Sequence, residues 1–174
     1  AKDGPQAPGL RERYRSARQG YKGDPGLMGL NFPHTPQEAT LVLGKLFAAL
    51  TTMEDPDLSL KVMATIERIW RLPGGDTVNL LVDRAQKAAD QNNADLALKL
   101  LDAAVDLAPD YAEAFNRRAY VHYMKGDAER ALGDLRRVLA LEPNHFKALE
   151  GLAKILSEQG QKKGALKAFE TLYK

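Results

Sequence analysis

AEAFNRRAYVHYMKGDAERALGDLRRVLALEP, residues Ala112 to Pro143, is one unit of a pattern that recurs every 34 residues in this chain of 174 residues. The residues that recur are apolar or small, and each has a counterpart one period before or after it. A period of about 20–50 residues indicates a solenoid of stacked supersecondary units, each packed on its neighbours. The matching sets are Leu81, Phe115 and Leu149; Ala85, Ala119 and Ala153; Ala97, Ala131 and Ala165; Leu101, Leu135 and Phe169; and Pro109 with Pro143.

Small residues and helix breakers within the unit predict a helix–turn–helix. Ala119 and Ala131 place a small side chain on each of two successive helices, so their backbones can pack closely. Gly126 lies between them, where a residue with positive φ ends the first helix, and Asp127 follows as a cap for the second. Pro143 ends the apolar run because proline cannot continue a helix. Equivalent roles are expected of Asn92 and Gly160 as helix ends, and of Asp110 and Asn144 as caps of the following helices.

The unit resembles the tetratricopeptide repeat (TPR), a helix–turn–helix motif of 34 residues. The resemblance covers residues 78–174 and implies an all-α fold, an α-solenoid of antiparallel helix pairs with three such units. It also implies a protein-binding role, but it does not name the partner, because a fold alone does not determine function. The residues that carry it are Phe115, Ala119, Ala131, Leu135, Val138 and Pro143.

The sequence divides into three segments. Residues 1–35 form an arm rich in glycine and proline around a short basic stretch, and residues 36–76 have the pattern of a degenerate TPR-like helix pair. Residues 77–174 hold the three units, and the last of them lacks the additional helix that usually closes such arrays. Phe169 is therefore expected to leave apolar surface at an open C-terminal end.

The degenerate pair has its own start and stop signals. A capping box at residues 35–38 (T-P-Q-E) predicts a helix that ends near Met53. The sequence D-P-D at residues 55–57 predicts a second helix, which continues to about Arg71. Trp70, at the end of that helix, is expected to be buried between the degenerate pair and the first repeat, and the alternative is an exposed aromatic that binds a partner.

The arm has two interpretations. It is either a solvated, flexible segment or a segment that docks on a partner or on the protein's own groove. In the second case its apolar anchors would be Leu27, Met28, Leu30 and Phe32. A third and less favoured hypothesis uses the arginines of the basic stretch to bind a membrane surface or nucleic acid, with salt-dependent affinity. Those arginines are Arg11, Arg13, Arg15 and Arg18.

Composition argues against several classes of function. The net charge of +2 gives no global basic field, which makes nucleic acid an unlikely partner, and no apolar run reaches the roughly 18 residues of a membrane span. The chain has no cysteine. His34, His122 and His145 fall in no catalytic or metal-binding motif. We therefore predict a protein that is not an enzyme and uses no cofactor or metal.

The predicted binding surface is the concave face, which first helices line in stacked helix pairs. Resemblance to the TPR family places positions two, five, nine and twelve of each unit there. The lining is mixed and suits a protein or peptide segment with an aromatic or aliphatic anchor, unless the two tyrosines only pack between helices. The candidate residues are Asn79, Val82 and Gln86; Asn116, Tyr120 and Tyr123; and Lys147, Glu150 and Lys154. The alternative is an assembly subunit that uses the arm and the open end for self-association.

The chain is also similar to exported bacterial TPR proteins that join a short module to TPR units. The similarity lies in LFAAL at residues 46–50, EDP at 54–56, IERIW at 66–70 and the leucines and alanine of residues 80–85. It implies a periplasmic location, and a cytoplasmic one is the alternative.

Overall fold

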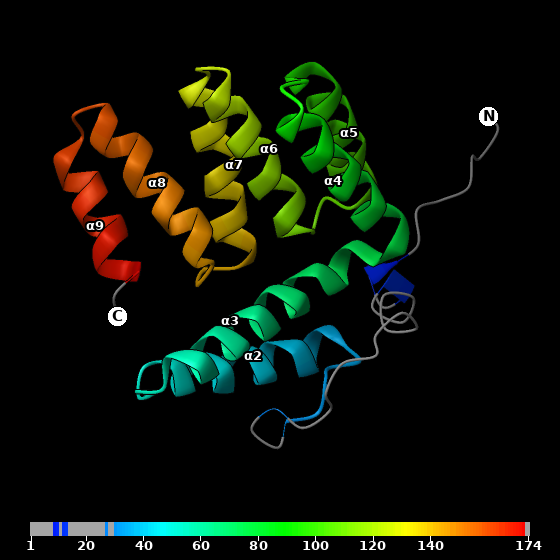
Figure 1. Cartoon of the computed structure of the whole chain (residues 1–174), viewed down its shortest axis with the longest axis vertical. Helices are drawn as coiled ribbons and strands as arrows, with labels where there is room; N and C mark the ends of the chain where they lie inside the picture. Colours follow the sequence, from blue (N-terminus) through cyan, green and yellow to red (C-terminus); the bar gives the residue numbers. More distant parts are fainter. Residues whose placement is uncertain (1–8, 11, 14–26, 28–29, 173–174) are drawn as a thin grey trace. The chain divides into compact units, whose positions relative to one another are not determined.

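A computed structural model of the chain describes residues 9–10, 12–13, 27 and 30–172. In these residues every regular element is a helix, so the predicted all-α fold is confirmed (Figure 1). Close contacts divide the chain into two compact units, Ala1–Asn79 and Leu80–Lys174. The helices are α2 (Pro36–Leu50), α3 (Pro56–Arg71), the 3-10 turn η2 (Leu72–Gly74), α4 (Gly75–Asp90), α5 (Ala94–Leu107), α6 (Ala112–Met124), α7 (Ala128–Leu141), α8 (Phe146–Glu158) and α9 (Lys162–Leu172).

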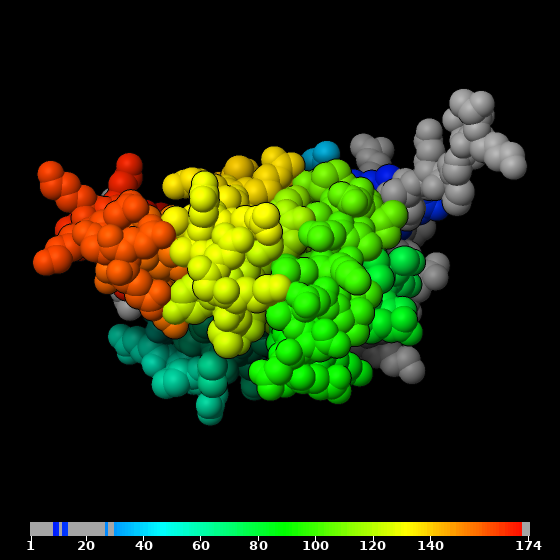
Figure 2. All heavy atoms as spheres, turned by 90° about the horizontal axis from the view of Figure 1, so that it is seen from above, coloured from blue at the N-terminus to red at the C-terminus, as the bar shows by residue number. Residues whose placement is uncertain are grey.

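The second unit is a stack of helix pairs. Helices α6 and α7 form one antiparallel pair and α8 and α9 the next, and α7 packs on α8 (Figure 1). In space-filling form the unit runs in chain order from α5 (green) through α7 (yellow) to the orange residues where α8 ends and α9 begins (Figure 2). The small residues of the repeat are buried where the helices meet, which confirms the predicted solenoid of helix pairs. They are Ala85, Ala119 and Ala153 in the first helices, and Ala97, Ala131 and Ala165 in the second.

The turns between paired helices repeat the same backbone geometry. Asn92, Gly126 and Gly160 have φ of 59°, 79° and 73°, as their expected role as helix ends requires. The next residue in each turn donates its amide to a carbonyl five residues earlier, which satisfies an end of the preceding helix. The acceptors of these three bonds are the carbonyl oxygens of Ala88, His122 and Leu156, one period apart.

The caps between repeats differ from the expectation. Helix α6 is preceded by Tyr111, whose side chain makes no capping bond, rather than by Asp110. The N-cap of α8 is His145 and not Asn144, and its Nδ1 accepts the amide of Ala148 at 3.2 Å. Both helices therefore begin one residue later than predicted, and both cap residues are buried. Asp127 does cap α7, as predicted, by accepting the amide of Arg130.

In the first unit, threonine side chains form hydrogen bonds with the backbone at both ends of α2. Thr35 caps the helix by accepting the amide of Glu38, as the capping box predicts. The helix ends at Leu50, three residues before the predicted end. The hydroxyl groups of Thr51 and Thr52 donate to carbonyl oxygens of the preceding turn. These side-chain bonds compete with the backbone bonds that would continue the helix.

Trp70 on α3 has 3% of its surface exposed, which confirms its predicted burial and excludes an exposed binding aromatic. Its ring centroid lies 6.0 Å from that of Phe47 on α2, so the two helices meet around an aromatic pair. Among the described helices, none combines the length and the apolar character that a membrane span requires.

Part of the arm lies against this helix pair. Leu27, Leu30 and Phe32 are half-buried and line a pocket of about 320 Å³ with residues of α2 and α3. The Arg68 guanidinium lies 5.9 Å from the centroid of the Phe32 ring. Met28, the remaining predicted anchor, lies outside the described residues.

The basic stretch contributes one described arginine. Arg13 is buried, and its Nε donates to the carbonyl oxygen of Pro73. Its side chain is therefore not the exposed cation that the membrane or nucleic-acid hypothesis requires. Arg11, Arg15 and Arg18 lie outside the described residues.

Candidate functional site

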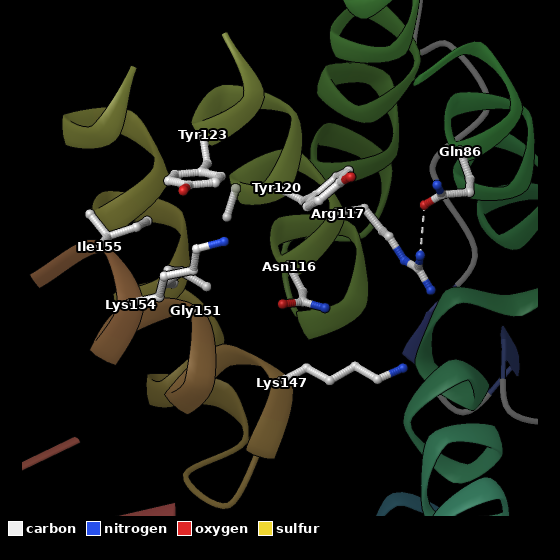
Figure 3. Close-up of a pocket in the computed structure, with 11 residues that line it drawn as sticks. Gln86, Asn116, Arg117, Tyr120, Tyr123, Lys147, Gly151, Lys154 and Ile155 are labelled. Carbon is white, nitrogen blue, oxygen red and sulfur yellow. Dashed lines mark hydrogen bonds between the residues drawn. The ribbon is translucent and has the colours of Figure 1, made fainter. Parts of the chain in front are cut away.

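The second unit contains an open pocket of about 280 Å³ between α6 and α8 (Figure 3). Helical spacing explains why these side chains share one space. Residues three, four and seven apart lie on one face of a helix, and both helices follow that spacing. Helix α6 contributes Asn116, Arg117, Ala119, Tyr120 and Tyr123; α8 contributes Lys147, Gly151, Lys154 and Ile155; and Gln86 of α4 and Leu135 of α7 complete the lining.

The floor of the pocket is apolar and built from small and branched residues. Gly151 has no side chain, and a Cβ at this position would lie 3.5 Å from the nearest methyl group of Leu135. Ile155 is buried one turn further along α8. The floor can therefore contact an aliphatic or aromatic group without opposing it with a charge.

The two tyrosines differ in how they are held. Tyr123 donates its hydroxyl to the carboxylate of Glu158 at 2.9 Å, and the Lys154 Nζ lies 5.0 Å from the centroid of its ring. Tyr120 is 50% exposed, so it does not simply pack between helices. One aromatic wall is thus fixed by neighbours on α8, and the other presents its surface to solvent.

Arg117 joins the pocket to a buried carboxylate. Its Nε donates to Glu113 at 2.6 Å, and its Nη1 donates to the side-chain oxygen of Gln86 at 2.6 Å (Figure 3). The Nε2 atom of His145 lies 3.5 Å from the second oxygen of Glu113. Burial favours a higher pKa for Glu113, but the contacts with His145 and Arg117 outweigh it and lower the pKa to about 2. Glu113 is therefore charged at neutral pH and holds Arg117 in place.

Six of the nine residues predicted for the concave face line this pocket. They are Gln86, Asn116, Tyr120, Tyr123, Lys147 and Lys154. Three do not. Val82 is 1% exposed, because it shares the buried face of α4 with Ala85; Asn79 donates to the carbonyl oxygen of Arg71 in the first unit; and Glu150 is exposed outside the pocket.

Several lining residues escaped the sequence analysis. Leu135 comes from a second helix, which the expectation for first helices excludes. Gly151 of α8 also lines the pocket and is not among the predicted residues. Arg117, which is likewise not among the predicted residues, pairs with Glu113 and lines the pocket. Helical spacing is the signal that could have identified the missed residues on α6 and α8. These residues lie three or four positions from Asn116, Tyr120 or Lys147 or from one another, and therefore on the same helix face.

The described residues offer no cluster of three or more histidine, aspartate or glutamate side chains that could hold a metal ion. His122 on α6 is buried, and burial lowers its pKa. What the pocket presents is a surface for recognition: an apolar floor, two aromatic rings and three cations.

Comparison with known proteins agrees with the fold. Two tetratricopeptide repeat family models match residues 82–135 and 122–172. A TPR repeat-containing protein of Rhizobium etli is 41% identical over 128 residues, which cover 74% of this chain and 63% of that protein. Tetratricopeptide repeat protein 36 of Bos taurus is 41% identical over 54 residues, 31% of this chain and 29% of that protein. The chain thus spans less than two thirds of the length of either relative.

Solved structures of MamA share the fold. One covers 78% of this chain and 83% of its own, with a TM-score of 0.53 and 16% identity. Another covers 93% of this chain and 89% of its own, with a TM-score of 0.50 and 19% identity. With the family matches and the repeat geometry, these findings define a helical-repeat protein, and the chain belongs to the tetratricopeptide repeat family. Members of this family are generally non-enzymatic scaffolds for protein interaction.

Proposed function

We propose that this chain is a non-enzymatic scaffold that binds a peptide or protein segment in the pocket between α6 and α8. The observation that carries the proposal is the pair of tyrosines beside an apolar floor, with Tyr120 half exposed to solvent and Tyr123 partly buried. A tyrosine offers a large contact area and a hydroxyl group at a small cost in side-chain entropy, and such residues dominate binding energy in interfaces. The floor of Gly151 and Ile155 supports the placing of one apolar side chain of the partner.

A selection experiment tests this proposal. The whole chain is immobilised and used to select from a displayed library of random peptides, in parallel with the variant Tyr120→Ala/Tyr123→Ala. The native chain should enrich a family of sequences that the variant does not retain. The matched control is Leu166→Ala on α9, an exposed apolar residue outside the pocket, which should enrich the same family.

Two results would count against peptide binding in this pocket. One is the absence of any enriched family on the native chain. The other is equal retention of the selected peptides by the tyrosine variant, with helicity unchanged by circular dichroism. The second result would move attention to another surface, such as the arm.

A second candidate function is assembly through the C-terminal end. Leu166 is 60% exposed and Phe169 38% exposed on α9, the last described helix. These residues support a contact with another protein surface, because exposed apolar patches often mark interaction sites. Measurement of the molar mass by light scattering tests it: association should weaken in Leu166→Gln/Phe169→Gln. A monomer at all accessible concentrations would remove this candidate.

A further inference from the structure

The direction of one amide group in the pocket specifies the partner further. Resting on the proposed peptide binding, we propose that the pocket selects a tryptophan side chain of the partner. The indole N–H donates to the side-chain oxygen of Asn116, and the six-membered ring contacts the apolar floor at Gly151.

A buried carboxylate fixes the direction of the Asn116 amide. The pKa of Glu113 is about 2, so at neutral pH its side chain is ionised and can only accept hydrogen bonds. Its Oε1 accepts the Nε of Arg117 at 2.6 Å, and its Oε2 accepts the Nδ2 of Asn116 at 3.3 Å. The nitrogen of the Asn116 amide must therefore face Glu113, and the oxygen must point the other way.

The Asn116 oxygen is an acceptor that the pocket offers to a partner. Figure 3 shows this oxygen on the side of Gly151 and Lys154, and the nitrogen on the side of Arg117. No described residue donates a hydrogen bond to the oxygen. Asn116 is half-buried, so the acceptor is partly withdrawn from water. A bound group that brings a donor here satisfies it, whereas a purely apolar group leaves it without a partner.

The rest of the pocket fits one large ring. Its volume of about 280 Å³ lies at the lower limit of the roughly 300–1,000 Å³ of sites that enclose a drug-sized ligand, so it suits a single large side chain. The floor of Gly151, Leu135 and Ile155 is apolar. Tyr120 and Tyr123 supply aromatic walls on which another ring can pack.

Tryptophan is the side chain that matches both the floor and the acceptor. Its Nε1–H is a donor only and lies at the edge of a large apolar ring system. Phenylalanine would contact the floor but leave the Asn116 oxygen without a donor. Tyrosine carries its hydroxyl at the tip of the ring, where it would meet the apolar floor, and arginine would bring a charge to that floor.

The selection experiment distinguishes this inference from the proposed function. The peptides that the native chain enriches and that Tyr120→Ala/Tyr123→Ala does not retain should share a tryptophan at one fixed position. Enrichment of phenylalanine, tyrosine, leucine or arginine at that position overturns the inference while peptide binding in the pocket stands. The absence of an enriched family overturns peptide binding itself.

A change in the peptide tests the hydrogen bond directly. Benzothienylalanine in place of the tryptophan of a selected peptide replaces the indole N–H by sulfur and keeps the shape of the ring. In a fluorescence anisotropy titration of labelled peptides, the native chain should bind this analogue about fivefold more weakly, as expected for the loss of one hydrogen bond. This comparison does not depend on the folding of any variant. Equal affinity of the native chain for the two peptides overturns the inference.

A variant of the protein identifies the acceptor. Asn116→Leu should bind the two peptides with affinities within about twofold of each other, because both peptides then lack the acceptor. The matched control is Gln37→Leu, which replaces an exposed amide on α2 in the first unit and should keep the native ratio. If Asn116→Leu has native helicity by circular dichroism and still prefers tryptophan about fivefold, the indole N–H does not donate to Asn116, and the inference is overturned.

Discussion

Arg118 on α6 donates two hydrogen bonds to the carboxylate of Asp134 on α7, from Nε to Oδ2 at 2.9 Å and from Nη2 to Oδ1 at 2.8 Å. Its Nη1 donates to Asp102 on α5 at 2.9 Å, so one guanidinium group links three successive helices. The bonds to Asp134 are the main reason that the pKa of Arg118 is raised. Asp134 is only 7% exposed, and Arg118 is the charged partner that its buried carboxylate contacts.

The first prediction concerns this pair. Arg118→Met should lower the free energy of unfolding by about 3 kcal/mol, because it leaves the Asp134 charge buried without its principal partner. Adding Asp134→Asn should recover part of the loss, since the buried charge is then removed. Urea denaturation of the single and double variants measures both effects.

Asp102 provides the control for that cycle. Its side chain is 60% exposed. Asp102→Asn should therefore lower the free energy of unfolding by less than about 1 kcal/mol, as is usual for ion pairs exposed to solvent. If Asp102→Asn and Arg118→Met lower the free energy of unfolding by the same amount, the burial of Asp134 does not explain the effect of losing Arg118.

The second prediction is a pH dependence that arises from Glu113. The pKa of this carboxyl is about 2 in the folded chain and 4.5 for an unperturbed group, so folding is favoured by its ionisation. This contribution is present above pH 4.5 and is lost as the pH falls through about 2. Native chain should exceed Glu113→Gln in stability at pH 7 by up to about 3 kcal/mol, and the difference should shrink across that acidic window.

Thermal melts at several pH values test this dependence. Glu150→Gln on α8 is the control, because it removes an exposed carboxylate from the same unit. Glu150→Gln should change the melting temperature only slightly at every pH tested. A constant difference between native chain and Glu113→Gln from pH 7 to pH 2 would contradict the assignment of Glu113 as the titrating group.

The third prediction uses two glycines that differ only in backbone conformation. Gly126 has φ of 79° in the turn after α6, whereas Gly133 lies inside α7, and a Cβ at either position would meet no atom within 4 Å. Gly133→Ala should stabilise the chain by about 0.5–1 kcal/mol through helix propensity. Gly126→Ala should destabilise it by about 1–2 kcal/mol, because alanine disfavours positive φ. Urea denaturation that shows a change in the free energy of unfolding in the same direction for both variants would contradict this account.

The repeat could be predicted from the sequence because the signals that define each helix pair are local. Small residues at fixed spacing and a residue tolerant of positive φ at Asn92, Gly126 and Gly160 are requirements of single helix pairs, and each is visible in one short stretch. Errors arose where a distant or competing partner decided the outcome. Helix α2 ends early because Thr51 and Thr52 bond the preceding carbonyl groups, which propensity does not anticipate.

The candidate site was predicted only in part, for a related reason. The expectation that first helices line the groove located Tyr120 and Lys154 in the pocket, because position on a helix face follows from spacing. It failed at Val82, whose face is covered in the folded unit, and it could not include Leu135 of α7. Whether a side chain is buried depends on what packs over it, and that is a property of the assembled repeats.

The fourth prediction asks whether the depth of the pocket matters for binding. Gly151 lies on the floor, where an added Cβ would make ordinary contact with Leu135 at 3.5 Å. Gly151→Ala should therefore fold as well as the native chain or better, since α8 gains a stronger helix former. Gly151→Leu should keep the fold but direct its branched end into the pocket, where it occupies the space of the partner's apolar side chain.

Titration of a selected peptide into both variants separates these effects. We expect Gly151→Leu to weaken binding by about tenfold or more, a loss comparable to that of one buried apolar side chain. Gly151→Ala should have a much smaller effect, because a methyl group removes little of the floor. The exposed Gly44→Leu on α2, in the first unit, is the control for adding an apolar side chain without filling this pocket. If Gly151→Leu is stably folded by thermal melting and still binds the peptide with native affinity, the partner's apolar group does not lie on this floor.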